Sequence, residues 1–208
     1  AKAEIEASGI SGKLSTLQLD VTDESSVKQA AEKVKTEFGR LDALVNNAGI
    51  ANGDKNPLTR FRACMETNVT GPVLVAQAFT PLLLKASNAY SIYVSSGLGS
   101  LTLATGPERA KLMPVEIVEA DAYRASKAAL NMVTVLDWDR YNEKGLKVFA
   151  MCPGFVRSNL RGTDEAAVSG WGGAGDPKVS GALVRDIIAG KRDADVGKFV
   201  KTDGVWPW

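Results

Sequence analysis

Tyr123 and Lys127 are two residues whose types and spacing could exchange protons from one face of a helix. They are four positions apart, so an α-helix places them one turn apart on the same side. A free tyrosine titrates near pH ~10, and an ammonium about 4 Å away at an effective dielectric of ~20 favours the phenolate by about 4 kcal/mol before desolvation losses. We therefore predict that Lys127 lowers the pKa of Tyr123, by at most about three units. The alternative is a packed tyrosine beside a solvated lysine.

The sequence contains no histidine, which restricts the chemistry available to it. This excludes Ser-His-Asp and Cys-His triads and the two-histidine zinc helix of metalloproteases. Cys64 and Cys152 lie far apart and outside any CxxC pattern, so we predict neither a disulfide framework nor a metal site, and we expect a reduced, cytoplasmic setting. An acid or base at the site must therefore be Tyr, Lys, Asp or Glu.

Charge and hydropathy argue against two classes of partner. The 25 Lys and Arg residues nearly balance the 24 Asp and Glu residues, for a net charge of +1, so we expect no nucleic-acid partner. The apolar stretches are too short to cross a bilayer, and the first nine residues lack the basic and apolar regions of a secretion signal. With 208 residues, 45% of them hydrophobic, the chain is expected to form one domain over residues 1–208.

Hydrophobic periodicity predicts strands and helices that alternate along the chain. Strands are expected over residues 14–20, 41–46, 89–96 and 146–152, helices over 23–38, 58–84, 123–142 and 177–190, a glycine-rich loop over 159–176 and a last strand over 197–203. This alternation predicts an α/β fold with a doubly wound, parallel, Rossmann-like sheet. The final GVWPW is expected to dock as an apolar tail.

The residues that could bind a ligand lie where the predicted strands end. In open α/β sheets the ligand site lies beyond the carboxyl ends of the strands. Four such ends are therefore expected to converge on one crevice, at Asp20, at Asn46 to Gly49, at Ser95 and Ser96, and at Pro153 and Gly154.

Four motifs occur in a fixed order along the chain: NNAG, VSS, YRASKAALN and CPG. Together they resemble the short-chain dehydrogenases/reductases, and the resemblance covers essentially the whole sequence. It implies a nicotinamide-dependent oxidoreductase in which Tyr123 is the general acid that protonates the substrate oxygen as hydride arrives. It also implies that Lys127 holds the nicotinamide ribose. The serine that holds the carbonyl oxygen is expected to be Ser96, with Ser95 as the alternative.

Asn68, within METNVTGP, matches the helix asparagine of the same family. Pro72 has no N–H, so in a continuous helix the carbonyl of Asn68, four residues earlier, would be left free. That carbonyl could then hold a water, as the family's proton relay through the lysine requires. The alternative is a simple proline kink.

The resemblance also implies a set of cofactor-binding residues. Asp20 is expected to accept a hydrogen bond from the adenine amino group, although an aspartate there could instead cap a helix. The NNAG backbone is expected to run beside the adenosine, the PG segment to lie against the nicotinamide, and Val156 to offer its backbone to the carboxamide. Ser158 stands where the family often has Thr. The whole set is Asp20, Val21, Asn46, Asn47, Ala48, Gly49, Tyr123, Lys127, Pro153, Gly154, Val156 and Ser158.

One family motif is missing from the sequence. No GxxxGxG turn precedes Asp20, so the first strand, the phosphate loop and the second strand, a β-α-β unit of ~30 residues, have no counterpart. We expect the native protein to carry this unit. Its absence would open the sheet between the strands ending at Asp20 and Asn46, unless the first of these slides over to pair directly with the second.

Residues 100–121 form a longer insertion than compact family members have, which resembles the carbonyl reductase-like branch. This implies NADPH as cofactor, with NADH as the alternative, and a monomer, with a homo-oligomer as the alternative. Residues 159–176 resemble the mobile substrate lid, or else form a surface loop without a role. The expected function is interconversion of a small-molecule carbonyl and an alcohol. The rival is a truncated, non-catalytic family member that acts as a structural or regulatory partner.

Overall fold

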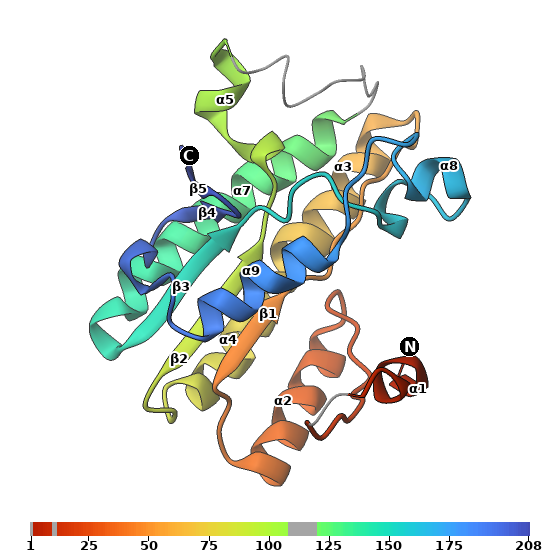
Figure 1. Ribbon diagram of the computed structural model, residues 1–208. Coiled ribbons are helices and arrows are strands. Elements are labelled where there is room, and N and C mark those ends of the chain that lie inside the picture. Colours follow the sequence, from red (N-terminus) through yellow and green to blue (C-terminus); the bar gives the residue numbers. More distant parts are fainter. Residues whose placement is uncertain (1, 10–11, 108–119) are drawn as a thin grey trace.

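The structure of the protein is a computed structural model that describes residues 2–9, 12–107 and 120–208. It confirms the predicted α/β fold, because a mostly parallel sheet runs through the molecule with helices against both of its faces (Figure 1). The strands lie in the order in which they occur along the chain. They are β1 (Ala43–Asn46), β2 (Ala89–Val94), β3 (Leu146–Met151), β4 (Phe199–Lys201) and β5 (Gly204–Trp206).

The helices follow the predicted alternation, with short turns added between them. The α-helices are α1 (Lys2–Ala7), α2 (Glu24–Phe38), α3 (Pro57–Met65), α4 (Gly71–Leu83), α5 (Leu101–Thr105), α7 (Asp121–Tyr141), α8 (Glu165–Val168) and α9 (Lys178–Ile188). A π-helical turn, η1 (Glu66–Thr70), joins α3 to α4. The 3-10 turns are η2 (Gly97–Gly99), η3 (Asn142–Lys144), η4 (Asn159–Arg161) and η5 (Asp193–Asp195).

The two faces of the sheet are covered by different helices because side chains alternate along each strand. Tyr90 and Ile92 of β2 pack with Ile187 of α9 in one cluster. Tyr93, on the opposite face, packs with Leu130 of α7 in another. This burial on both faces explains why β2 and β3 are nearly continuous runs of apolar residues.

Parallel pairing brings the carboxyl ends of three strands together. β1 pairs with β2 from Ala43 and Tyr90 onward, and β2 pairs with β3 as far as Val94 and Met151. The backbone N–H of Ser95 donates to the Met151 carbonyl at 2.8 Å, which extends the pairing by one residue. The residues that follow β1, β2 and β3 therefore lie together at the carboxyl end of the parallel strands, as predicted.

The prediction of a strand over residues 14–20 is wrong. These residues form no strand among the described elements, and neither do they slide over to pair with β1, whose only partner is β2. Leu17 and Leu19 are left 39% and 37% exposed. Backbone groups form a strand only where a neighbouring strand can pair with them, and none lies beside this segment in the described part of the chain.

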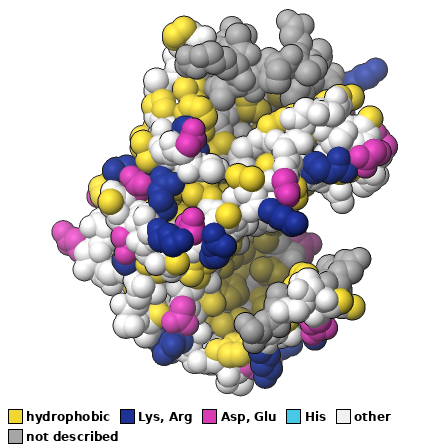
Figure 2. Space-filling model, viewed as in Figure 1, with side chains coloured by type: hydrophobic (Ala, Val, Ile, Leu, Met, Phe, Trp, Pro, Cys, Tyr) yellow, Lys and Arg dark blue, Asp and Glu magenta, His cyan; other side chains and the backbone are white. Residues whose placement is uncertain are grey.

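The N-terminal part of the molecule is attached mainly through α2. Val27 and Ala30 of α2 pack against Val75 and Phe79 of α4, and Val21 lies against the same cluster. Figure 2 shows a hollow, with hydrophobic side chains inside it, between this N-terminal part and the rest of the molecule. A pocket between α2 and the start of β1 is lined by Val34, Phe38, Arg40, Leu41 and Asp42.

The C-terminal residues dock as predicted and add a strand that the sequence did not indicate. β5 pairs antiparallel with β4. The ring of Trp208 stacks on Phe199 at 5.6 Å between ring centroids, and its carbonyl accepts hydrogen bonds from Thr102. Among the helices that the structure describes, none combines the length and hydrophobicity that a transmembrane segment requires.

Candidate active site

Tyr123 and Lys127 lie one turn apart on α7, as their spacing predicts. The Nζ atom of Lys127 is 5.6 Å from the centroid of the Tyr123 ring. Lys127 is only 4% exposed, and its ammonium donates a hydrogen bond of 2.8 Å to the carbonyl of Val94, the last residue of β2. The lysine therefore belongs to the site and is not solvated.

The effect of Lys127 on the Tyr123 pKa differs from the prediction. Burial raises the pKa of Tyr123 to about 12, although a side-chain hydrogen bond with Ser96 opposes the rise. Burial lowers the pKa of Lys127 to about 8. Lys127 therefore loses its proton at a lower pH than Tyr123 does, so its charge is gone before the phenol ionises. At neutral pH Tyr123 is protonated, which is the state of a proton donor.

The two serines after β2 point in different directions. Ser95 is buried, and its hydroxyl donates to Oδ1 of Asn131 on α7 at 2.5 Å. Ser96 is only partly buried, and its side chain lies close enough to the Tyr123 phenol to lower the pKa of that group. The structure thus places the side chains of Ser96 and Tyr123 close together at one end of the sheet. The Ser95 side chain instead packs against α7.

Asn68 is fully buried and joins two parts of the site. Its Oδ1 accepts from the backbone N–H of Ile50, and its Nδ2 donates to the Ile50 carbonyl, both at 2.8 Å. The same Nδ2 donates to the hydroxyl of Ser126 at 2.9 Å, and Ser126 in turn donates to the Tyr123 carbonyl at 2.7 Å. Asn68 therefore ties the segment after NNAG to the first turns of α7.

The backbone around Asn68 forms a π-helical turn, whereas the prediction assumed a continuous α-helix. It lies in η1, where the N–H of Gly71 bonds to the carbonyl of Glu66, five residues earlier. Such π-helical turns inside helices are frequent at functional sites. A free Asn68 carbonyl that holds a water stays a prediction.

Two glycines allow the elements of the site to approach closely. A Cβ atom at Gly99 would lie 2.6 Å from the backbone carbon of Lys127, so only glycine lets η2 pack on α7 there. A Cβ atom at Gly49 would lie 3.3 Å from Oδ1 of Asn68 and 3.4 Å from Nζ of Lys127. The end of the NNAG segment is therefore part of the same cluster as Asn68 and Lys127.

The residues predicted to bind adenosine lie on the open side of the sheet. Asp20 is exposed, and its Oδ1 accepts from the N–H and the hydroxyl of Thr22, which lower its pKa. The cap of α2 is Asp23, so Asp20 is not a helix cap. Asn46 is buried, and its Nδ2 has no hydrogen-bond partner among the described residues, whereas Asn47 and Ala48 are exposed.

The residues predicted to face the nicotinamide follow β3. The Pro153 carbonyl accepts a 2.7 Å hydrogen bond from Ser180 of α9, and Gly154 follows it in the left-handed region, at φ 79°. The Val156 carbonyl accepts from Arg161, and the Ser158 hydroxyl accepts from the N–H of Leu160 at the start of η4. All four predicted residues therefore lie beyond the carboxyl end of β3, and two of them organise the loop that follows.

Sequence reasoning missed three residues of the site. The Cys152 sulfur accepts from the N–H of Gly97 at 3.3 Å, which joins the end of β3 to the turn after Ser96. Ser126 and Asn131 are, like Lys127, among the buried residues of α7. A helical projection of YRASKAALN could have shown the last two, because they follow Tyr123 at intervals of three and eight residues.

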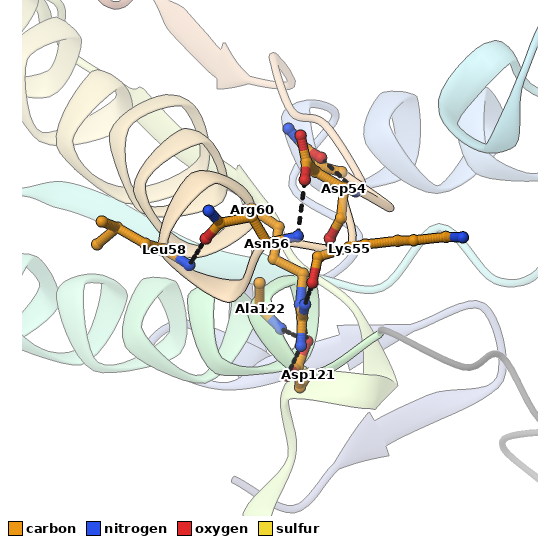
Figure 3. Close-up of polar contacts among 8 residues, drawn as sticks. Asp54, Lys55, Asn56, Leu58, Arg60, Asp121 and Ala122 are labelled. Carbon is orange, nitrogen blue, oxygen red and sulfur yellow. Dashed lines mark hydrogen bonds and ion pairs between the residues drawn. The ribbon is translucent and has the colours of Figure 1, made fainter.

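An ion pair holds the start of α7, two residues before Tyr123 (Figure 3). Arg60 of α3 donates to both carboxylate oxygens of Asp121, from Nε at 2.8 Å and from Nη2 at 2.7 Å. Its Nη1 donates to the carbonyls of Asp54 and Lys55. The side-chain hydrogen bonds from Arg60 lower the pKa of Asp121 to about 2. Ala120, the residue before α7, provides no side-chain cap. The two hydrogen bonds from Arg60 to Asp121 therefore help to hold the first turn of α7.

The structure describes all of one segment predicted to lie near the substrate and only part of the other. Residues 159–176 contain η4 and α8 within a closed loop. Of the insertion at residues 100–121, the structure describes residues 100–107, which include α5, and residues 120–121, where α7 begins. Residues 108–119 lie outside the described residues, and so does the part of the insertion from which a monomer was predicted.

The chain is similar to known proteins over most of its length. Residues 1–108 match the family of short chain dehydrogenases. The short-chain dehydrogenase/reductase tropE of Talaromyces stipitatus is 37% identical over 201 residues, which cover 92% of this chain and 75% of tropE. The corresponding eupG of Phoma sp is 33% identical over 213 residues, covering 92% and 76%. The NADPH-bound carbonyl reductase from chicken fatty liver superposes with a TM-score of 0.80 at 30% identity, covering 100% of this chain and 81% of that one.

Proposed function

The chain belongs to the short-chain dehydrogenase/reductase family of oxidoreductases, and on this premise we propose that it interconverts a carbonyl compound and an alcohol with a nicotinamide cofactor. The observation that carries the proposal is the position of the Tyr123 phenol, close to the Ser96 side chain that lowers its pKa and 5.6 Å, measured to the ring centroid, from the buried ammonium of Lys127. A carbonyl oxygen placed between the two hydroxyls could accept a hydrogen bond from each. That is the arrangement required to protonate it.

The roles of the three residues follow from this geometry. In reduction, the carbonyl carbon gains a hydride and the carbonyl oxygen gains a proton, which Tyr123 supplies. Tyr123 is protonated at neutral pH because burial raises its pKa to about 12. Ser96 holds the oxygen while negative charge develops on it. Lys127 lies close enough to support the ionised phenol and to bind a ribose hydroxyl of the cofactor.

The residues present fit a nicotinamide cofactor. Asn46 presents a buried donor at the end of β1 that has no partner among the described residues, and a ligand acceptor there would remove the cost of leaving it unpaired. We propose NADP(H), because a structural relative at 30% identity is described as NADPH-bound; NAD(H) is the alternative. The cofactor would supply the hydride when it is bound. A monomeric, cytoplasmic enzyme stays a prediction.

Binding of NADPH to the full-length protein tests the proposal against the non-catalytic rival. Titration into NADPH should quench its fluorescence or shift it to the blue, and the bound complex should then reduce aldehydes or ketones. The Tyr123→Phe variant is the matched control, because it should bind NADPH and fail to turn over. A folded protein with no effect on the fluorescence would favour the structural or regulatory role.

A further inference from the structure

The segment that follows β3 closes on itself beside the proposed site. Its two ends pair, since the N–H of Gly175 donates to the Phe155 carbonyl at 2.9 Å and the N–H of Arg157 donates to the Gly175 carbonyl at 3.0 Å. We call residues 155–175 the 155–175 loop. Compact loops of this kind, whose ends meet, are frequently functional.

Arg161 holds this loop from within. Its Nε donates to the Ala167 carbonyl at 3.0 Å, and its Nη2 donates to the carbonyls of Val156 and Val168 at 2.9 and 3.1 Å. The guanidinium also lies 4.5 Å from the centroid of the Phe155 ring. A side chain tethered by three hydrogen bonds and a ring has little freedom left, so its remaining atoms are oriented in advance.

The tether leaves part of the guanidinium available. A guanidinium carries five N–H groups, one on Nε and two on each Nη. The single Nε–H and both Nη2–H groups are used on carbonyls, and Nη1 donates to no described residue. Two N–H groups of a fixed cation therefore have no partner within the described chain.

The charge of Arg161 is also uncompensated, because all three of its acceptors are neutral carbonyls. No carboxylate among the described residues forms an ion pair with it. Arg157, in the same loop, shows the usual outcome, because it pairs with Glu165 at 2.8 Å. A partly buried arginine without an acidic partner fits a site that awaits an anion.

Arg161 lies beyond the carboxyl end of β3, at the same end of the sheet as the proposed reaction centre. It ends η4, which begins directly after Ser158, beyond the carboxyl end of β3. Its positive charge reaches the Tyr123 phenol and opposes the rise in pKa that burial causes there. Lys127 is the other cation near that phenol, with its Nζ 5.6 Å from the ring centroid, and its ammonium already donates to the Val94 carbonyl.

We propose that Arg161 determines substrate specificity by binding an anionic group, a carboxylate, on the carbonyl substrate. The substrate class would then be aldehydes or ketones that carry an acid group, held by the two Nη1–H donors while the carbonyl lies at Ser96 and Tyr123. This inference rests on the proposed function and adds the class of substrate to it.

The test compares an acidic and a neutral substrate of similar shape, 4-formylbenzoate and its methyl ester, reduced with NADPH by the full-length protein. The wild type should prefer the acid in kcat/KM. Arg161→Met should reduce the ratio of acid to ester by about tenfold or more, as expected for a charge-assisted hydrogen bond. Arg157→Met, which removes a paired arginine from the same loop, should leave the ratio unchanged.

The outcomes separate specificity from a purely structural role. If Arg161→Met lowers kcat/KM equally for both substrates, Arg161 only holds the loop and the proposal is overturned. If that variant does not fold, the wild-type preference decides, and a preference for the ester refutes the proposal. If the wild type reduces neither compound, the proposed function fails, and calorimetric titration with 4-formylbenzoate then decides the role of Arg161. Binding that is tighter to the wild type than to Arg161→Lys or Arg161→Met supports it, and equal binding overturns it.

Discussion

The centre of the sheet and its β1 edge differ in how completely they are packed. In β2 and in β3, five of six residues are buried, whereas in β1 one of four is buried. The proposed proton donor and its partners lie on the well-packed side. The residues predicted to bind adenosine, at the end of β1 and around Asp20, lie on the open side. The residues proposed to catalyse the reaction are therefore more completely packed than the residues predicted to bind the adenosine end of a cofactor.

The physical reason is the number of partners that each strand has. β2 pairs on both sides and is covered by α9 on one face and by α4 and α7 on the other. Among the strands that the structure describes, β1 pairs only with β2, and residues 14–20 do not pair with it. A strand with one unpaired edge keeps its outer backbone groups in water and buries less apolar surface.

The largest effect is expected from removing the proton donor on the packed side. Tyr123→Phe should lower turnover by about 10²- to 10⁴-fold, because general acid catalysis is lost. Cofactor affinity should stay nearly unchanged, since the residues of the open side are untouched. Steady-state kinetics and NADPH titration measure the two effects. Turnover close to that of the wild type would contradict the assignment.

Lys127 should affect both turnover and cofactor binding, because it is expected to stabilise the ionised Tyr123 phenol and to bind the cofactor ribose. Lys127→Met should lower turnover and weaken cofactor binding together. In the wild type, reduction should slow as the pH rises through about 8, where Lys127 loses its proton, and Lys127→Met should lack this decline. Unchanged cofactor affinity in the variant would count against the ribose role, and an identical pH profile would exclude Lys127 as the titrating group.

Substitution of Ser95 and of Ser96 should have different effects, one on stability and the other on turnover. Ser96→Ala should reduce turnover by about 10²-fold, because a donor to the developing oxyanion is lost. Ser95→Ala should instead lower the free energy of unfolding by about 1–3 kcal/mol, because it removes the donor to the buried Oδ1 of Asn131. Denaturant unfolding and kinetics on both variants measure this. The reverse ranking in turnover would move the oxyanion role to Ser95.

The smallest expected effect is a difference in local opening between β1 and β2. In the 208-residue chain, amide hydrogens of β1 should exchange at least about tenfold faster than those of β2, because local opening is easier where fewer contacts must break. Hydrogen exchange followed by mass spectrometry resolves the two strands. Equal protection would show that β1 is as stable against local opening as the centre of the sheet, which would contradict this prediction.

The sequence by itself determined most of the packed side. The spacing of Tyr123 and Lys127 placed both on one helical face, and the motifs at the ends of β1, β2 and β3 predicted one shared edge. These predictions succeeded because helical spacing depends only on the chain nearby. Long apolar runs also indicate buried parallel strands wherever helices cover both faces.

Tertiary structure decided the remaining features, because each depends on a partner far away in the chain. Residues 14–20 have the apolar pattern of a strand but lack a neighbour to pair with. Whether Ser95 or Ser96 faces Tyr123 depends on how β2 meets α7, and the pairing of Arg60 with Asp121 joins residues 61 positions apart. The pKa of Tyr123 was predicted to fall and instead rises, since burial, which no local spacing reveals, outweighs every neighbouring charge.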